Sequence, residues 1–258
     1  MIKICFSLVI PMVLFANIYI EGSTTIRPVV KEAAKEFSAK SGIKIHIKGG
    51  GSSRGLAALK EGNCDIAMVS KPLTDADHKT FKVHTLARDA VAIIVHAVNV
   101  RESITTKEVI DIYSGKMAHW KTNAKITVVD KNSGRGTKKV FDNYFKIENI
   151  SRESYRVGSN TETVLYVSTD RNAIGYVSVG AAEKAIEKGL QIKILSLEGK
   201  RPTLENIKNG TYLLGRTLSL VTLKQSTEET ERFVDFLLSG KSEKFIRKQH
   251  YIPIANRK

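Results

Sequence analysis

Residues 43–59 read IKIHIKGGGSSRGLAAL, and they show the local pattern on which the fold class depends. Residues 43–48 alternate between apolar and polar side chains, which is typical of a strand with one buried face. Glycine and serine follow at 49–55 and indicate a turn. An apolar helical stretch then begins at Leu56. The segment therefore predicts a strand, a Gly/Ser-rich turn and a helix in immediate succession.

The same order of strand, turn and helix occurs twice more. It runs from NIYI at 17–20 through EGSTTIRP to a helix, and from KITVVD at 125–130 through KNSGRGT to KKVFDNYFK. An apolar run at 91–98, VAIIVHAV, is long enough for a central strand. Amphipathic helices are predicted at 106–115 and 227–240. Strands that alternate with helices indicate an α/β fold with mostly parallel sheets.

The composition excludes several classes of protein. The 258 residues are 42% hydrophobic and 26% charged, which argues against a disordered chain and against a multispan membrane protein. Two cysteines cannot form a disulfide scaffold. The six histidines have neither HxxH nor HxxxH spacing, so we predict no metal site and no cofactor.

Basic residues outnumber acidic ones by 41 to 26, which gives a formal net charge of +15. Such a charge either attracts an anionic partner, whether nucleic acid, membrane surface or small anion, or forms a solvated basic surface. The chain has no run of five Lys or Arg residues and no aromatic RNP-type motif. We therefore predict no nucleic-acid partner, and we interpret the charge as long-range attraction for a negative ligand.

The first 16 residues, MIKICFSLVIPMVLFA, are typical of a secretory signal peptide. Lys3 precedes an apolar run of about 12 residues, whereas a membrane-spanning helix needs about 20. Cys5 lies at the start of this run, so it is not a lipidation site. We expect cleavage after Ala16 and an exported, periplasmic protein. A buried first strand or an uncleaved anchor is the alternative.

Each of the three Gly/Ser/Thr-rich turns precedes a predicted helix. The start of a helix carries unpaired N–H groups and a partial positive charge, so it attracts anions. Glycine lets the backbone approach a ligand, and Ser or Thr hydroxyls add uncharged donors. In an α/β sheet such turns meet at the carboxyl ends of the strands. They predict one anion held by converging helix starts, although each turn alone is also ordinary helix capping.

Residues 51–55, GSSRG, also match the GxSxG motif of serine hydrolases between a predicted strand and a predicted helix. Ser53 would then be the nucleophile, and Asp142 and His250 follow in the required order. Against this, only one strand is readable before the motif in the mature chain, whereas an α/β-hydrolase sheet normally has several. We predict that the protein is not an enzyme, and a hydrolase stays the alternative. The stretch matches neither GxxxxGK[ST] nor GxGxxG, so it does not support nucleotide binding.

Over most of residues 18–254 the sequence resembles the phosphate-binding proteins of bacterial ABC transporters, which have the type 2 periplasmic-binding-protein fold. The most specific matches are AIGYVSVG at 173–180, and DIYSGK at 111–116 followed by Trp120. The other matches occur in the order of the family and are IEGSTTIRPVV (20–30), GGGSSRGLAAL (49–59), DIAMVSKPL (65–73), DAVAIIVHAVN (89–99), SGRGTKKVF (133–141) and FVDFLLSGKSEKFIRKQHYIPI (233–254).

The resemblance implies a two-lobed α/β protein in which each lobe is a mixed, mostly parallel sheet flanked by helices. It implies a monomer that captures inorganic phosphate between its lobes and delivers it to a membrane ABC permease. After a signal peptide at 1–16, the first lobe would comprise residues 17–88 and 216–258, and the second lobe residues 89–215. Extended strands would connect the two lobes.

The resemblance also implies phosphate contacts from both lobes. The first lobe would contribute two threonines after the first strand, a serine at the second helix start and the residue after DIAMV. The second lobe would contribute the third helix start. These ligand-binding residues are Thr24, Thr25, Ser52, Ser70, Arg135, Gly136 and Thr137.

Three positions depart from the family pattern. Ser70 replaces an Asp that accepts the hydrogen of HPO4²⁻ in many members. Arg135 replaces a serine, so a hydroxyl is lost and a cation is gained if the side chain turns inward. Lys131 matches an upstream Arg and offers a point charge in place of a bidentate fork. Anion binding tolerates these changes better than strict phosphate selectivity does. A binding protein for another oxyanion such as sulfate therefore stays an alternative, as does a surface interaction protein that has kept the fold.

Overall fold

The computed structural model describes residues 17–147, 150 and 153–254, and the signal-peptide prediction for residues 1–16 lies outside them. The strands are β1 (Asn17–Gly22), β2 (Lys44–Gly49), β3 (Ile66–Val69), β4 (Phe81–His96), β5 (Ser103–Ile104), β6 (Thr127–Lys131), β7 (Tyr155–Val157), β8 (Ala173–Ser178), β9 (Ile192–Leu197), β10 (Gly215–Leu223) and β11 (Ile252–Pro253). The α-helices are α1 (Arg27–Ser41), α2 (Ser52–Lys60), α3 (Asp75–Thr80), α4 (Thr106–Tyr113), α5 (Gly136–Phe145), α6 (Asn160–Thr169), α7 (Val179–Glu187), α8 (Leu204–Lys208), α9 (Glu228–Leu238) and α10 (Glu243–Arg247).

The strands form one mixed sheet in the order β2-β1-β3-β10-β4-β8-β6-β7. β1 is parallel to β2 and β3, and β6 is parallel to β7 and β8. Every antiparallel pairing between the described strands involves β4 or β10, which are neighbours in the middle of the sheet. The α/β fold class is therefore confirmed, and the antiparallel strands lie where the two halves of the molecule join.

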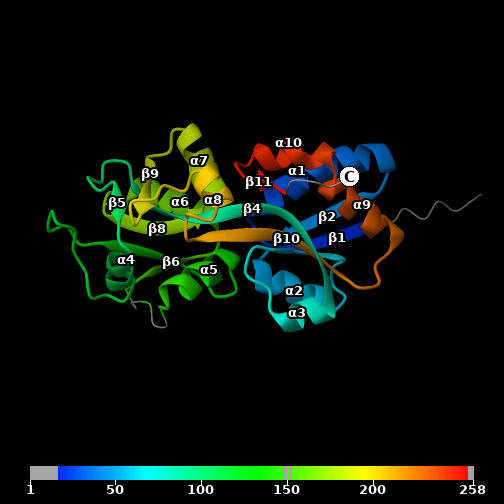
Figure 1. The fold of residues 1–258 in the computed structure, drawn as a ribbon, viewed down its shortest axis with the longest axis horizontal. Helices are drawn as coiled ribbons and strands as arrows, with labels where there is room; N and C mark the ends of the chain where they lie inside the picture. The colour runs from blue at the N-terminus through cyan, green and yellow to red at the C-terminus, as the bar shows by residue number, and fades with distance from the viewer. Residues whose placement is uncertain (1–16, 148–149, 151–152, 255–258) are drawn as a thin grey trace, which may run out of the picture.

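β4 is a long strand that runs through both halves of the molecule. Residues 81–90 pair with residues 215–223 of β10, and residues 91–96 continue beside β8 and β9. The apolar run at 91–98 predicted only the second part of this strand. The first part is less uniformly buried, so its side chains do not form a continuous apolar run. Figure 1 shows β4 and β10 passing from one group of helices to the other.

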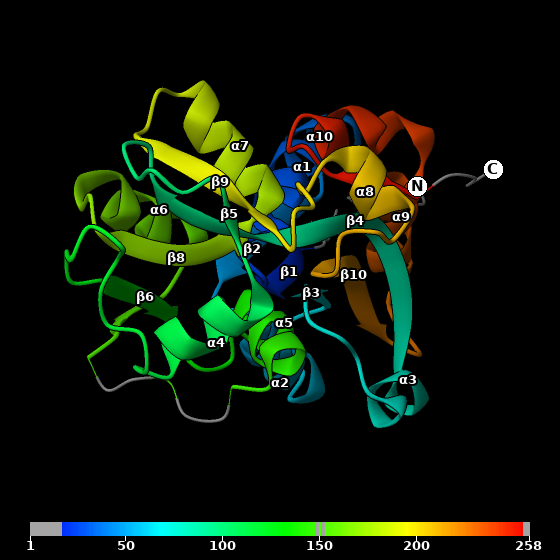
Figure 2. The same ribbon diagram turned by 60° about the vertical axis from the view of Figure 1, so that its left-hand side comes forward.

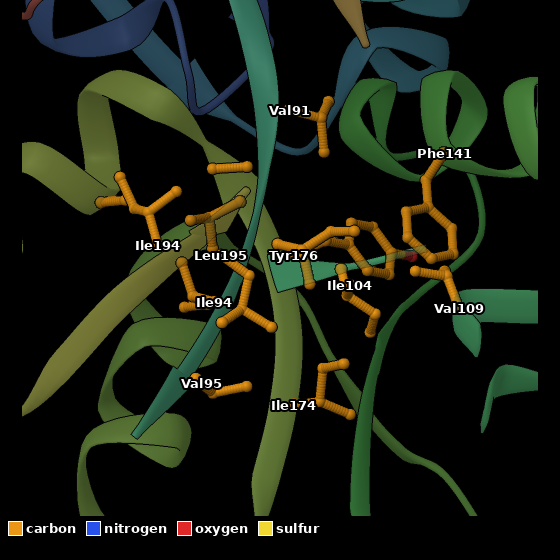
Figure 3. Close-up of a cluster of buried hydrophobic side chains, with 14 of the residues drawn as sticks. Val91, Ile94, Val95, Ile104, Val109, Phe141, Ile174, Tyr176, Ile194 and Leu195 are labelled. Atoms are coloured by element: carbon orange, nitrogen blue, oxygen red, sulfur yellow. The ribbon is translucent and has the colours of Figure 1, made fainter. Parts of the chain in front are cut away.

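Each half of the molecule has its own hydrophobic core. One cluster of buried side chains comes from residues 90–214, and it includes Phe141 stacked on Tyr176 with ring centroids 3.9 Å apart (Figure 3). A second cluster combines residues 18–87 with residues 218–251, and a smaller third cluster lies in the same half. Burial of apolar surface is the main favourable term in folding, so two cores produce two lobes (Figure 2).

The helices of the first lobe cover both faces of its part of the sheet, with α1, α9 and α10 on one face and α2 and α3 on the other (Figure 1). The buried residues of α1 recur at three- and four-residue spacing, as expected for a helix with one apolar face. α1 ends at Gly42, whose φ of 73° is in the left-handed region that favours glycine. Among the described residues, no helix has the length and apolar character needed to cross a membrane.

Candidate anion-binding site

Turns from both lobes meet in a small pocket. Six of the seven predicted ligand-binding residues line it, and the seventh, Ser52, is hydrogen-bonded to Ser70. The free space inside the pocket is about 10 Å³, which is roughly the room that one water molecule needs. The pocket is lined by Ser23, Thr24, Thr25, Gly51, Ser70, Lys131, Arg135, Gly136, Thr137, Gly158, Ser159 and Asn160.

The turn after β1 is held closely against β3. Gly22 has a φ of 135°, and a Cβ atom on it would lie 2.3 Å from the carbonyl oxygen of Met68, so the position requires glycine. The Ser23 N–H donates to the same carbonyl at 2.8 Å, and the Thr25 N–H donates to Ser23 Oγ at 3.2 Å. These bonds bring the threonine pair to the pocket.

Three serines from separate segments form a buried hydrogen-bonded group. Ser70 Oγ lies 2.7 Å from Ser23 Oγ and 3.4 Å from Ser52 Oγ. The Ser70 N–H also donates to Ser52 Oγ at 3.0 Å. Because a hydroxyl can either donate or accept, this group offers a ligand hydrogen bonds of both kinds. No carboxylate lines the pocket among the residues that the structure describes.

Gly136 brings the second lobe into contact with this group. A Cβ atom on Gly136 would lie 2.5 Å from the Oγ atoms of both Ser52 and Ser70. Gly136 is also the first residue of α5, whose first N–H groups have no partner within the helix. Arg135 precedes it and also lines the pocket. Its buried Nε atom has no hydrogen-bond partner among the described residues.

Lys131 is a buried cation in the pocket wall. Its Nζ atom donates to the carbonyl oxygen of Ser159 at 3.1 Å and to Thr163 Oγ1 at 2.7 Å. Burial, and next the positive charge of Arg216, lower the pKa of Lys131 to about 7. The ammonium group therefore gains or loses its charge near neutral pH, and an anion in the pocket favours the charged form.

Arg216 on β10 connects residues of both lobes through all five of its N–H groups. Nε and Nη2 donate to Asp89 Oδ2 at 3.0 and 2.7 Å. Nη1 donates to the carbonyl oxygen of Ser70 at 3.3 Å and to Thr137 Oγ1 at 3.0 Å. Nη2 also donates to Thr25 Oγ1 at 3.3 Å. The guanidinium group has five N–H donors, so none is left for a ligand in this arrangement.

This arrangement sets the direction of two hydroxyl groups. A guanidinium group only donates, so the Oγ1 atoms of Thr25 and Thr137 must accept from Arg216. Thr25 Oγ1 also accepts from Asn160 Nδ2 at 3.2 Å. The hydrogens of both hydroxyls are then available to other acceptors, and both threonines line the pocket. The pocket thus has one available hydroxyl donor from each lobe, and both can donate to an anion.

Asp89 balances the charge of Arg216 in the interior, where both side chains are almost fully buried. Burial raises the pKa of Asp89, and the adjacent guanidinium opposes that rise. Since the charges of this pair cancel, Lys131 and Arg135 are the cations left among the lining residues, and the nearby carboxylate of Glu162 interacts with both of them.

The residues of the alternative catalytic triad are not assembled. Asp142 pairs with Lys138 at 3.3 Å, and His250 pairs with Glu187 at 2.9 Å. Ser53 is exposed, and its N–H donates across the lobes to a carbonyl oxygen at 3.2 Å. This geometry does not favour the hydrolase.

Sequence reasoning missed five residues of the site, namely Ser23, Gly158, Ser159, Asn160 and Arg216. A signal existed for two of them, because Ser159 caps α6 and Glu162 stands three residues later, which is the pattern of a capping box. That pattern could have predicted a fourth helix start at the pocket. Arg216 has no such local signal, since its partners are distant in sequence.

The fold is a mixed sheet divided into two lobes, with a pocket lined by residues of both lobes between them. The chain belongs to the PBP superfamily, since the family model for the PBP superfamily domain matches residues 15–241. The resemblance read from the sequence is thereby confirmed, together with its fold class.

The chain is similar to curated proteins that carry the name phosphate-binding protein PstS. It is 28% identical to the protein of Borreliella burgdorferi over 251 residues, which cover 91% of this chain and 89% of the relative. It is also 28% identical to the protein of Bacillus subtilis over 258 residues, which cover 94% of this chain and 82% of the relative.

Two solved structures share both fold and sequence. One is a phosphate ABC transporter substrate-binding protein with bound phosphate from Clostridium perfringens, with a TM-score of 0.85, 28% identity, and coverage of 92% of this chain and 99% of that chain. The other is an ABC-type phosphate transport receptor from Vibrio cholerae, with a TM-score of 0.77, 28% identity, and coverage of 92% of this chain and 100% of that chain.

Proposed function

We propose that this chain is an exported solute-binding protein that captures inorganic phosphate between two lobes and delivers it to an ABC permease. The observation that carries the proposal is the pocket, which combines hydroxyl donors and helix starts from both lobes with two cations from the second lobe. Relatives that the chain matches over most of their length are named for phosphate binding, and one of the similar structures holds phosphate. We assign no catalytic step to the protein.

We assign the ligand contacts to the seven residues predicted from the sequence, with Lys131 and Asn160 added. The oriented hydroxyls of Thr25 and Thr137 would each donate to a phosphate oxygen, because each already accepts from Arg216. Lys131 and Arg135 would balance the negative charge. The mobile lobes would be residues 17–88 with 216–258, and residues 89–215, and the β4–β10 pair would be the hinge.

The export step rests on the signal pattern of residues 1–16. We place the mature protein outside the cytoplasmic membrane as a monomer, where it would meet both its ligand and its permease.

Titration calorimetry of ligand-stripped protein with phosphate tests the proposed function. Gly136→Ala puts a methyl group 2.5 Å from two serine oxygens, so we expect phosphate affinity to fall about 10- to 100-fold. Gly240→Ala is the matched control, because a Cβ atom there meets nothing within 4 Å. A wild type that releases no heat with phosphate, or two variants that behave alike, would contradict the proposal.

Sulfate is a second candidate ligand, and the composition of the pocket wall supports it. Phosphate near neutral pH carries a hydrogen that needs an acceptor, and sulfate carries none. The described wall of the pocket has hydroxyls and carbonyl oxygens but no carboxylate to repel sulfate. The same calorimetric titration with sulfate distinguishes the two ligands.

A further inference from the structure

The strand β2 lies at the outer edge of the first lobe's sheet (Figure 1). It pairs with β1 along residues 44–49, and no strand in the described part of the chain pairs with its other edge. Such an edge presents backbone N–H and C=O groups that can pair with a further strand. The edge therefore offers a row of backbone hydrogen bonds to an extended segment.

A groove of about 430 Å³ lies between this strand and α1. Ile45 and Ile47 are half-buried and form its floor with Ala34, while the basic side chains from α1 are exposed along its rim. The groove is lined by Arg27, Lys31, Ala34, Lys35, Ser38, Ile45 and Ile47. Its wall thus combines an apolar floor with three cations spaced one helical turn apart.

The charges of α1 are divided between its two sides. Glu32 and Glu36 are paired with lysines, at 3.7 Å for Glu32 and at 2.5 and 2.9 Å for Glu36. By contrast, none of the three basic residues in the groove forms an ion pair among the described residues. The two glutamates of α1 are therefore neutralised within the lobe, whereas its three basic side chains at the groove are available to a partner.

The opposite face of β2 is basic as well. Side chains alternate between the two faces of a strand, so Lys44 and Lys48 lie on the face away from Ile45 and Ile47. Both lysines are exposed. The free edge of β2 therefore has positive charges on both of its faces, so acidic side chains on either face of an added strand would lie near cations.

We propose that this groove binds an extended acidic segment of a partner protein, which adds to β2 as a further strand. In strand addition the backbone bonds supply affinity, and pockets for alternate side chains supply specificity. Two apolar side chains of the segment would contact the floor at Ile45 and Ile47. Acidic side chains would meet the cations of α1 on one face and the lysines of β2 on the other.

The charge argues for this occupant over two others. A second copy of the chain would bring its own net charge of +15 to the edge, and lysines at a sheet edge oppose such self-pairing. An anionic membrane would use exposed cations but neither the recessed apolar floor nor the strand edge. None of the groove residues lines the anion pocket, so this inference stands apart from the proposed function.

The probe for this test is the capped peptide Glu-Glu-Val-Glu-Val-Glu-Glu-Glu, whose two valines have the spacing of Ile45 and Ile47. We expect saturable 1:1 binding by fluorescence anisotropy at low salt, and slower hydrogen exchange of β2 amides in the complex. Lys31→Glu with Lys35→Glu is expected to weaken binding about tenfold or more. Lys79→Glu with Lys241→Glu makes the same change in net charge at exposed sites elsewhere, and it should change the affinity less than twofold.

Backbone methylation of the peptide separates strand addition from simple charge attraction. Only one alternate set of peptide N–H groups can face β2, so N-methylation of that set should abolish binding while methylation of the other set preserves it. Equal effects of the two sets, or equal effects of the two double variants, would overturn the proposal. So would binding to phosphatidylglycerol vesicles that depends on Lys31 and Lys35 while the peptide does not bind.

Discussion

Arg216 and Asp89 face each other in register on the two strands that run between the lobes, and they form a buried ion pair with Nη2 2.7 Å from Oδ2. The same guanidinium holds the Oγ1 atoms of Thr25 and Thr137, one from each lobe. The β4–β10 pair is therefore connected directly to the hydroxyl donors of the pocket. The Arg216 side chain therefore contributes both to the stability of the fold and to the arrangement of the donors in the pocket.

Removal of Asp89 should destabilise the protein strongly. Asp89→Ala leaves the guanidinium buried without its counter-charge, so we expect the free energy of unfolding to fall by about 3–5 kcal/mol in urea denaturation. The double variant Asp89→Leu with Arg216→Met removes both charges and should recover most of that loss. The phosphate affinity of the double variant should nevertheless be at least about tenfold lower than that of the wild type, because Arg216 no longer fixes the direction of the two threonine hydroxyls. Wild-type affinity in the double variant would show that Arg216 does not orient them.

Lys131 should make anion binding depend on pH near neutrality. The pKa of Lys131 is lowered to about 7 by burial, and an anion binds the protonated form better. Sulfate does not titrate in this range, so it reports the lysine alone. We expect sulfate affinity to fall as pH rises above about 7, by up to about tenfold per pH unit. Lys131→Met should bind sulfate weakly and without this slope; a flat profile in the wild type contradicts the assignment.

The same group should make stability rise with pH. In the unfolded chain a lysine keeps its ordinary pKa near 10.4, whereas the folded value is about 7. Between these values the unfolded state binds more protons, so the free energy of unfolding of ligand-free protein increases with pH by up to about 1.4 kcal/mol per unit. Urea denaturation of wild type and Lys131→Met from pH 7 to 9 measures the difference, and parallel curves would refute this prediction.

Ser70 should determine how well the site distinguishes phosphate from sulfate. A carboxylate at this position would accept the hydrogen of HPO4²⁻ and repel sulfate, whereas a hydroxyl tolerates both. We expect weak discrimination in the wild type and stronger discrimination in Ser70→Asp, measured by competition calorimetry. Ser70→Asn is the control of similar size without the charge. If a large excess of sulfate fails to displace phosphate from the wild type and Ser70→Asp changes nothing, another group selects the ligand.

Ligand exchange should require the lobes to separate, because residues of both lobes enclose a pocket with about 10 Å³ of free space. A Cβ atom on Gly134 would lie 3.5 Å from the Cβ atom of Ser53, which is within the range of a disulfide. Ser53→Cys with Gly134→Cys, oxidised after loading with phosphate, should therefore trap the ligand. We expect release at least about tenfold slower than in the reduced protein, by a stopped-flow phosphate assay.

The Gly134 position has a φ of 79°, so the single variant Gly134→Cys is the control for backbone strain. Release that is equally fast in the oxidised and reduced double variant would show that the ligand leaves without separation of the lobes.

Local patterns in the sequence were sufficient for the class of fold and for the three turns at the pocket. The strand, turn and helix around Gly51 and the similar segments before Thr25 and Thr137 reflect periodicity and turn chemistry, which act over a few residues. In the structure, Thr25, Gly51 and Thr137 from these turns line one pocket. That Ser70 is buried among hydroxyls was not visible locally, although its place after a predicted strand was.

The tertiary structure was needed for the part of the site that orients the donors. Arg216 lies 127 positions from Asp89 and 191 positions from Thr25, and only the pairing of β10 with β4 brings them together. An arginine in a strand has the same local appearance whether it faces water or a buried carboxylate. The five hydrogen bonds of Arg216 and the lowered pKa of Lys131 depend on burial and on residues distant in sequence. The same is true of the three groove cations on α1, which have no ion-pair partner among the described residues. Periodicity and local motifs carry no information on such distant neighbours.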